Sequence, residues 1–284
     1  MRLALVLRSP RAVIGGALVL LLLVCAVFAP LLAPHDPAEQ NLTSLLLPPF
    51  WQPGADPSFP LGTDSLGRDV LSRALWGARL ATEVAVLATA GAMALGTVLA
   101  HVAGYWGGAA DWVIGRLVDI WMSFPPVILS LILMVGLGVG TDKLILAIIL
   151  VDWTRFCRVL RSEVLVVTRR DHVAAARLLG YGHLRTLLVE VLPATLPLLL
   201  TLASLEGGIA VVAEAVLSFV GLGVSPDQAA WGQMIADGRN DIADAPWAVL
   251  VPMGCIFVSV AGFNLLGDGL RRTLDVRLLG REAT

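Results

Sequence analysis

The stretch AVIGGALVLLLLVCAVFAPLLA, residues 12–33, runs for 22 residues without a charged side chain. A helix needs about 20 apolar residues to cross the hydrocarbon core of a bilayer, so this stretch is long enough for one crossing. A secretory signal peptide has an apolar region of only about 7–15 residues, followed by a small-residue cleavage site. The stretch ends in APLLAPHD, which offers no such site. We therefore expect a retained transmembrane helix.

Five further stretches are candidate membrane spans. Three of them carry no acidic or basic residue other than His101. The other two are interrupted by charged side chains, which are costly inside a membrane. The sequence therefore predicts an all-α, polytopic membrane protein with six transmembrane helices. They are residues 12–33, 84–103, 120–139, the interrupted 144–160 and 194–216, and 246–266.

The overall composition agrees with a membrane protein. Hydrophobic residues make up 57% of the chain and charged residues 15%, with a mean hydropathy of +0.82. Soluble domains contain about 25% charged residues. The net charge of −2 leaves no basic surface that would indicate nucleic-acid binding.

The distribution of basic residues predicts the orientation. If six spans start from a cytoplasmic N-terminus, 15 of the 20 basic residues lie on the cytoplasmic side. The opposite orientation would reverse this bias, which the positive-inside rule disfavours. We expect both termini, and the segment between the fourth and fifth spans, to be cytoplasmic.

That cytoplasmic segment contains RRDHVAAARLLGYGHLRTLLVEVLP, residues 169–193, which predicts two short helices. Asp171 is a suitable N-cap for a first helix through residues 172–179, which include the strong helix formers Ala174, Ala175 and Ala176. Gly180 stands where a helix commonly ends in the left-handed conformation. A second helix fits residues 183–191, and Pro193 suits the first turn of the next span. Two readings stay open on these grounds, a docking element for another protein and an ordinary basic loop.

Several segments of the chain resemble a known family. Ala175-Ala176, Gly180 and VEVLP match the coupling-loop motif of ABC-importer permeases, although Ala174 stands where that motif has glutamate. Further segments resemble, in order, the second permease of dipeptide, oligopeptide and nickel importers. They are LGTDSLGRDVLSRALWGAR, GYWGGAADWVIGRLVDIWMSFP, EAVLSFVGLG, WGQMIADGR and FNLLGDGLRRTLD, and the similarity covers nearly the whole chain from Leu61 onward together with the N-terminal span.

The resemblance implies a type I ABC-importer permease fold in a bacterial inner membrane. Residues 1–78 would form the N-terminal tail, the first span and an external segment. Residues 79–284 would form the core permease domain, with a coupling loop at about 161–193. The implied partners are a homologous second permease, two cytoplasmic ATP-binding subunits and an external substrate-binding protein. The residues implied to contact the ATPase are Asp171, His172, Ala174, Ala175, Ala176, Gly180, Gly182 and Pro193.

The sequence does not indicate an enzyme. A phosphate-binding P-loop requires a lysine after glycine, and the only lysine, Lys143, follows Asp142. No G-x-S-x-G motif occurs either. We therefore expect no catalysis and no cofactor in this chain, with ATP and Mg²⁺ bound by the partner subunits.

Three acidic residues within the expected spans are candidates for the substrate path. Glu206 precedes two glycines near mid-membrane and can hold a peptide ammonium or metal chelate. Alternatively it pairs with an arginine of the companion permease or stays protonated. Glu214 lies at the external end of the same span, where a gating or structural role is favoured. Asp152 is three residues before Arg155, a spacing that predicts a same-face pair.

The cargo and the class of transporter leave alternatives. Peptides are the first choice of cargo, and nickel or a metal chelate is the second. A stand-alone channel or secondary transporter is the alternative class, but no internal repeat is visible. The external segments 34–78 and 218–245 lie where a binding protein would dock. The first is proline-rich and should be irregular until a helix near residues 69–78.

Overall fold

The computed structural model describes residues 9–225 and 227–274. Within these residues the chain is helical apart from turns, loops and one isolated bridge between Thr63 and Asp69. The elements are α2 (Pro10–Leu32), α3 (Val70–Trp106), α4 (Gly108–Met122), α5 (Pro126–Leu137), α6 (Thr141–Val167), α7 (Asp171–Leu178), α8 (His183–Thr186), the π-helix η1 (Leu187–Val191), α9 (Leu192–Phe219), α10 (Trp231–Gly238) and α11 (Trp247–Leu274). The all-α prediction is confirmed for this part of the chain.

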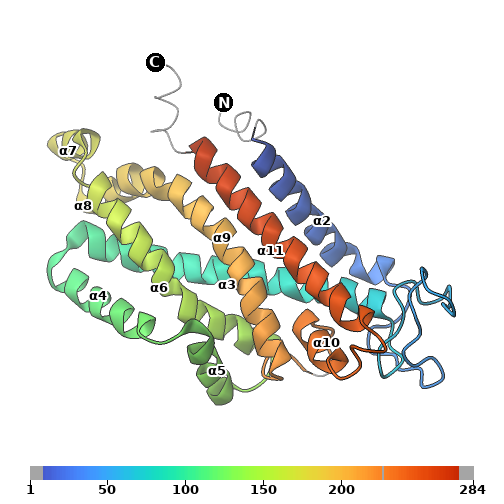
Figure 1. Cartoon of the computed structure of the whole chain (residues 1–284). Coiled ribbons are helices and arrows are strands. Elements are labelled where there is room, and N and C mark those ends of the chain that lie inside the picture. Colours follow the sequence, from blue (N-terminus) through green and yellow to red (C-terminus); the bar gives the residue numbers. More distant parts are fainter. Residues whose placement is uncertain (1–8, 226, 275–284) are drawn as a thin grey trace.

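The long helix α3 lies at the centre of the bundle. It packs along α6, α2 and α9, while α11 packs against α2 and α9 (Figure 1). Glycines permit the close approach of α3 to α6: a Cβ at Gly96 would lie 2.6 Å from the carbonyl oxygen of Trp153, and one at Gly104 2.8 Å from Val164. Small residues at such crossings are typical of helices packed in membranes.

The six predicted spans are confirmed in part. Within residues 9–225 and 227–274, four helices are long and apolar enough to cross a membrane, namely α2, α3, the continuous helix His183–Phe219, and Trp247–Thr273. The expected span at residues 120–139 is not one continuous helix, because α4 and α5 meet at an angle of 91°. Pro125 and Pro126 lack the N–H groups that would continue the helix, and Pro125 is extended. Counted together, the bent pair would make a fifth crossing.

Helix α6 contains the weakest predicted span. It is 27 residues long, or about 40 Å at the rise of an α-helix, but it carries several charged side chains. Two of these pair with the neighbouring α4: Arg158 donates to Asp119 at 2.7 Å, and Arg161 forms a two-bond pair with Asp111. Helix α4 therefore compensates two of the arginines in the second half of α6.

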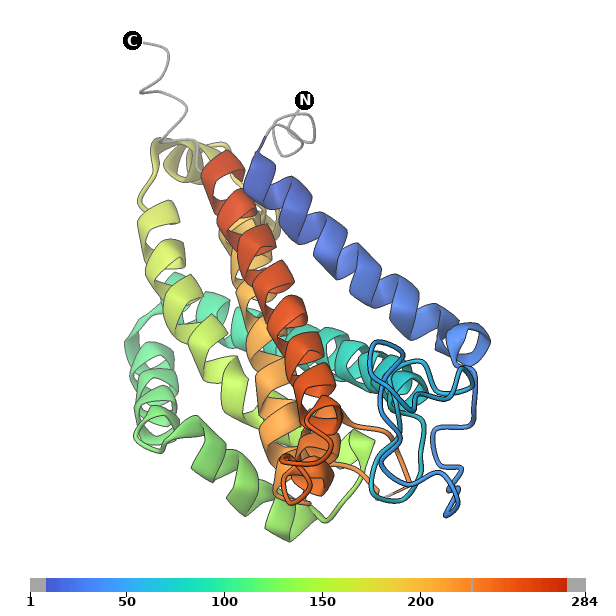
Figure 2. The same cartoon turned by 45° about the vertical axis from the view of Figure 1, so that its right-hand side comes forward.

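The bundle has two distinct ends. The Pro10 end of α2, the Leu274 end of α11 and helix α7 lie at one end, and residues 33–69 and α10 lie toward the opposite end (Figures 1 and 2). An ion pair between Arg11 and Asp268, 3.4 Å apart, joins α2 to α11 at the first end. This arrangement puts the hairpin on the same side as the described terminal helices.

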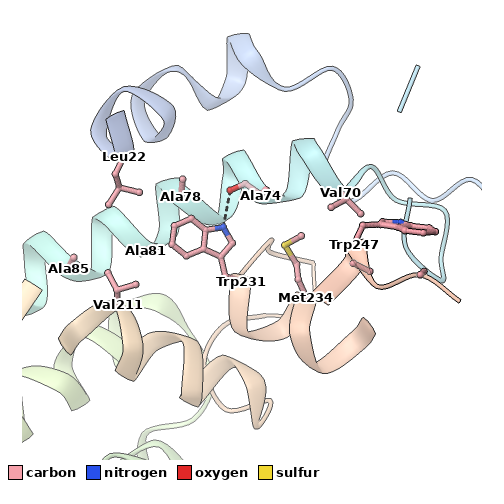
Figure 3. Close-up of a cluster of buried hydrophobic side chains, with 12 residues drawn as sticks. Leu22, Val70, Ala74, Ala78, Ala81, Ala85, Val211, Trp231, Met234 and Trp247 are labelled. Atoms are coloured by element: carbon pink, nitrogen blue, oxygen red, sulfur yellow. Dashed lines mark hydrogen bonds between the residues drawn. The ribbon is translucent and has the colours of Figure 1, made fainter. Parts of the chain in front are cut away.

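At the opposite end, α10 packs onto α3. Figure 3 shows Trp231 of α10 between alanines of α3, with its indole N–H donating to the carbonyl of Ala74 at 2.9 Å. Gly77 leaves room for the ring, since a Cβ there would lie 2.6 Å from it. The expected helix near residues 69–78 is confirmed: α3 begins at Val70, and Asp69 accepts hydrogen bonds from the first-turn N–H groups. Residues 33–69 before it form turns.

Candidate functional site

The hairpin begins with α7, which starts one residue earlier than predicted. Arg170 is the N-cap and Asp171 lies in the first turn without a capping bond, so the prediction of Asp171 as N-cap is wrong. Arg170 has the extended backbone that an N-cap requires, and the Asp171 carboxylate still lies at the positive end of the helix dipole. Val173 packs inward on Val164 and Val167 of α6.

The glycine turn after α7 is confirmed. Gly180 has φ +84°, and the N–H of Tyr181 bonds to the carbonyl of Ala176 at 3.1 Å. The Gly180 N–H bonds to the carbonyl of Arg177 at 3.0 Å, which completes a Schellman motif. Nothing lies within 4 Å of where a Cβ on Gly180 would stand, so the conformation rather than lack of space requires glycine.

The predicted helix over residues 183–191 is confirmed, but it is not a separate short helix. Helix α8 ends at Thr186 and passes through the π-helical turn η1 directly into α9. In this turn the Leu192 N–H bonds to the carbonyl of Leu187, five residues back. Pro193 follows at once. Because its ring would collide with the carbonyl four residues before it in a regular α-helix, the wider turn accommodates it.

Tyr105, near the end of α3, contacts two side chains of the hairpin. Its hydroxyl lies 3.4 Å from Nδ1 of His183, and the Arg177 guanidinium lies 5.2 Å from the centre of its ring. A second cation–π contact joins Arg185 to Tyr181 at 4.0 Å. Sequence analysis missed these contacts because Tyr105 is far from the hairpin along the chain.

The outer surface of the hairpin combines small and apolar side chains. Asp171, His172, Ala174, Ala175 and Gly182 are exposed. The largest exposed apolar groups are Leu178 at 90%, Leu179 at 78% and Leu184 at 63%. Exposed apolar groups gathered on one element are typical of a surface that contacts another protein.

The acidic residues of the spans have partners that sequence analysis did not foresee. Glu206 of α9 accepts a hydrogen bond from Nη1 of Arg155 in α6, at 3.3 Å. Asp152 and Arg155 lie on the same face of α6 as predicted, but Arg155 makes its ion pair with Glu206 rather than with Asp152. The sequence left open that Glu206 pairs with an arginine of the companion permease. In the structure its partner is Arg155 of the same chain. Asp152 is buried, and within the described residues no basic group lies at ion-pair distance from it.

A cavity of about 290 Å³ lies between α5, α6 and α9. Its wall is mainly apolar, with Val127 from α5, Ile148 from α6 and Ile209 from α9. Asp152 and Arg155 are the charged residues that line it. The structure thus brings two predicted intramembrane charges to one apolar cavity, with Glu206 bonded to one of them.

Glu214 lies apart from this cavity. It is 1% exposed and accepts a hydrogen bond of 2.7 Å from the Ser218 hydroxyl on the next turn of α9. This local bond favours the structural role among those considered for Glu214.

A buried ionic cluster joins residues 64–73 to α10. Arg68 donates to Asp64 and to Asp237, both at 2.7 Å, and Arg73 lies 3.5 Å from Asp237. The two arginines and two aspartates compensate one another in a site from which solvent is largely excluded. The segments LGTDSLGRDVLSR and WGQMIADGR, which are far apart in the sequence, therefore meet here.

Comparison with known proteins agrees with this architecture. Residues 72–280 match the family "Binding-protein-dependent transport system inner membrane component", and residues 6–49 match the "N-terminal TM domain of oligopeptide transport permease C".

Three relatives illustrate the similarity. The chain is 40% identical over 269 residues to the di/tripeptide transport system permease protein DppC of Pseudomonas aeruginosa, covering 94% of this chain and 89% of the relative. It is 40% identical over 271 residues to the dipeptide transport system permease protein DppC of Escherichia coli K12, covering 95% and 90%. It is 35% identical over 272 residues to the glutathione transport system permease protein GsiD of Pectobacterium atrosepticum, covering 96% and 89%. The chain belongs to the family of binding-protein-dependent transport system inner membrane components.

Proposed function

We propose that the chain is a permease subunit of an ATP-driven importer for dipeptides and short oligopeptides. The observation that carries this proposal is the 40% identity, over nearly the full length, to permeases named for di- and tripeptides. The relatives reported above are named for peptides, including the tripeptide glutathione, which favours peptides over nickel or a metal chelate.

The importer is a heteromeric complex in the bacterial inner membrane. It contains a second permease, two ATP-binding subunits that hold ATP and Mg²⁺, and an external substrate-binding protein. The family description, which names binding-protein dependence and the inner membrane, supports this assembly. This chain contributes half of the translocation path and no catalytic chemistry.

The chain crosses the membrane six times with both termini in the cytoplasm. The crossings are α2, α3, the bent pair α4–α5, α6, the helix from α8 through α9, and α11. Two observations support this order: the hairpin lies at the same end as Pro10 and Leu274, and the arginine-rich segments gather at that end. Residues 33–69 and α10 then face the outside, where the binding protein docks.

The hairpin couples the permease to an ATPase subunit. Its exposed surface, with Ala174, Ala175 and Leu178, fits a cleft on that partner, and the Schellman turn at Gly180 fixes the angle at which it enters. When ATP closes the ATPase pair, the hairpin moves with it and carries α6 and α9. Asp152 and Glu206 belong to the translocation path, and Glu214 supports its external end.

Affinity purification of the tagged chain from its native membrane tests the proposal. We expect a second permease and two ATPase subunits to copurify. In proteoliposomes, the complex should hydrolyse ATP faster when a loaded binding protein is added and should take up a labelled dipeptide. A homo-oligomer without ATPase activity would refute the proposal and favour a channel or secondary transporter. Uptake of nickel instead of dipeptide would refute the cargo alone.

A further inference from the structure

The cavity between α5, α6 and α9 carries opposite charges one helical turn apart. Asp152 and Arg155 both line it from α6, and the remainder of the wall is mainly apolar. Asp152 is 6% exposed, so its carboxylate has been taken out of water. Ionisable groups placed so deep in a membrane protein are expensive and mark a path or a partner.

The charges around the cavity do not balance within the described residues. Arg155 is bonded to Glu206, which leaves the Asp152 carboxylate without a basic group at ion-pair distance there. The wall can therefore accept a cation at Asp152. It can accept an anion at Arg155 if that anion replaces Glu206 on the guanidinium.

The spacing of the two groups matches a very short peptide. Side chains three residues apart on a helix have Cβ atoms about 5–6 Å apart. An extended chain spans at most about 3.3–3.6 Å per residue, so a dipeptide is about 7 Å long. The two charged ends of an extended peptide of four residues are about 14 Å apart, which is too far for one end to lie at Asp152 and the other at Arg155.

We propose that this cavity binds a dipeptide by both charged ends, with Asp152 receiving the ammonium group and Arg155 the carboxylate. This inference rests on the proposed function and adds a recognition site within the permease itself. The carboxylate of the peptide takes the place of Glu206 on the planar guanidinium, so Arg155 keeps one charge-assisted contact while Glu206 loses its partner. Binding thereby separates α6 from α9 at their ion pair.

The test measures binding of labelled Ala-Ala to the purified complex of both permeases and the ATPases, in the absence of the binding protein. Competitors are unlabelled Ala-Ala, its N-acetyl form and its C-terminal amide. We expect each capped form to compete about tenfold or more weakly than the free dipeptide, since each lacks a hydrogen-bonded charged contact.

The variants assign each end of the peptide to a residue. Arg155→Gln should abolish discrimination against the amide but keep discrimination against the N-acetyl form, and Asp152→Asn should do the reverse. Arg158→Gln is the matched control, because Arg158 lies one turn further along α6 and pairs with Asp119 outside the cavity. Since Arg155→Gln leaves Glu206 buried without its partner, Arg155→Gln with Glu206→Gln provides a second version in which no charge is stranded.

Several outcomes overturn the inference. They are equal competition by the free and capped forms in the natural complex, no measurable binding of Ala-Ala to it, or the same loss of discrimination in Arg158→Gln. Uptake of Ala-Ala by the complete importer is measured alongside. If the natural complex takes up Ala-Ala but does not discriminate between free and capped dipeptides, only this inference fails. If the natural complex shows no uptake of Ala-Ala, the proposed function is refuted.

Discussion

Replacing Gly180 by valine tests the hairpin as a mechanical joint. Gly180 has φ +84°, a conformation that costs an L-residue about 1–2 kcal/mol and a β-branched residue more. If the turn opens instead, the chain loses the bonds from Tyr181 to Ala176 and from Gly180 to Arg177. These are worth about 0.5–1.5 kcal/mol each.

Either route costs about 1–3 kcal/mol, confined to the hairpin. This is a fraction of the roughly 5–15 kcal/mol that stabilises a typical folded domain, so the variant should remain folded in the membrane. A shift of 1.4 kcal/mol already changes an equilibrium about tenfold, so the ratio of natively angled to displaced hairpins should fall about tenfold or more. We expect assembly with the second permease to persist and ATP-driven uptake to fall about tenfold or more.

The assay is uptake of labelled dipeptide and ATP hydrolysis in proteoliposomes of the complete complex. Gly182→Val is the matched control, because Gly182 is also exposed with open space around it but has φ −66° and ψ 159°, which valine adopts freely. Gly180→Asn is a second control, since asparagine tolerates the left-handed region. Normal uptake by Gly180→Val at normal expression would refute the reasoning. Equal loss in Gly182→Val would show that the surface, rather than the turn, is what matters.

Three further predictions concern the contacts that hold the bundle. Tyr105→Ala should reduce binding-protein-stimulated uptake several-fold while basal ATP hydrolysis continues. Tyr105→Phe keeps the ring that contacts Arg177, so its uptake should be near normal. An equal loss of uptake in both variants would contradict a role for the ring contact. Arg68→Ala should destabilise the purified complex by about 3 kcal/mol, because it leaves Asp64 and Asp237 with Arg73 as their one remaining arginine in the cluster, and Arg239→Ala at an exposed position should not, as thermal unfolding would show. Trp231→Phe removes one buried hydrogen bond and should cost about 1 kcal/mol in the same assay; no change would mean that water replaces the bond.

The features that could be predicted from the sequence are those decided locally. The turn at Gly180 depends on hydrogen bonds that join residues at most five positions apart, so the residue types around it suffice. The helix start at Val70 follows from the neighbouring Asp69 in the same way. By contrast, the break between α4 and α5 lies within an uncharged run. Hydropathy registers no change there, although Pro125 and Pro126 mark the position.

Contacts between distant segments could not be predicted, because nothing in the local sequence selects one partner from several. Arg155 has Asp152 on the same helix face, yet it bonds to Glu206, 51 residues away. Arg161 likewise pairs with Asp111, 50 residues away. In each case the pairing follows from how α6 lies against α9 and α4 in the folded chain, which the charges themselves do not reveal.

The charged cavity and the docking hairpin lie at two levels of one helix pair. Helix α6 ends at Val167 and leads into the hairpin, and the hairpin continues through η1 into α9. Arg155 lies about 18 Å from that end of α6, and Glu206 lies about 21 Å into α9, at 1.5 Å per residue. The ion pair between Arg155 and Glu206 joins α6 to α9 at the cavity. Because the hairpin connects the same two helices, a displacement of the hairpin moves both partners of that ion pair. A peptide carboxylate that takes Glu206's place releases the bond and lets α6 and α9 respond separately, so occupancy of the cavity and movement of the hairpin control the same contact.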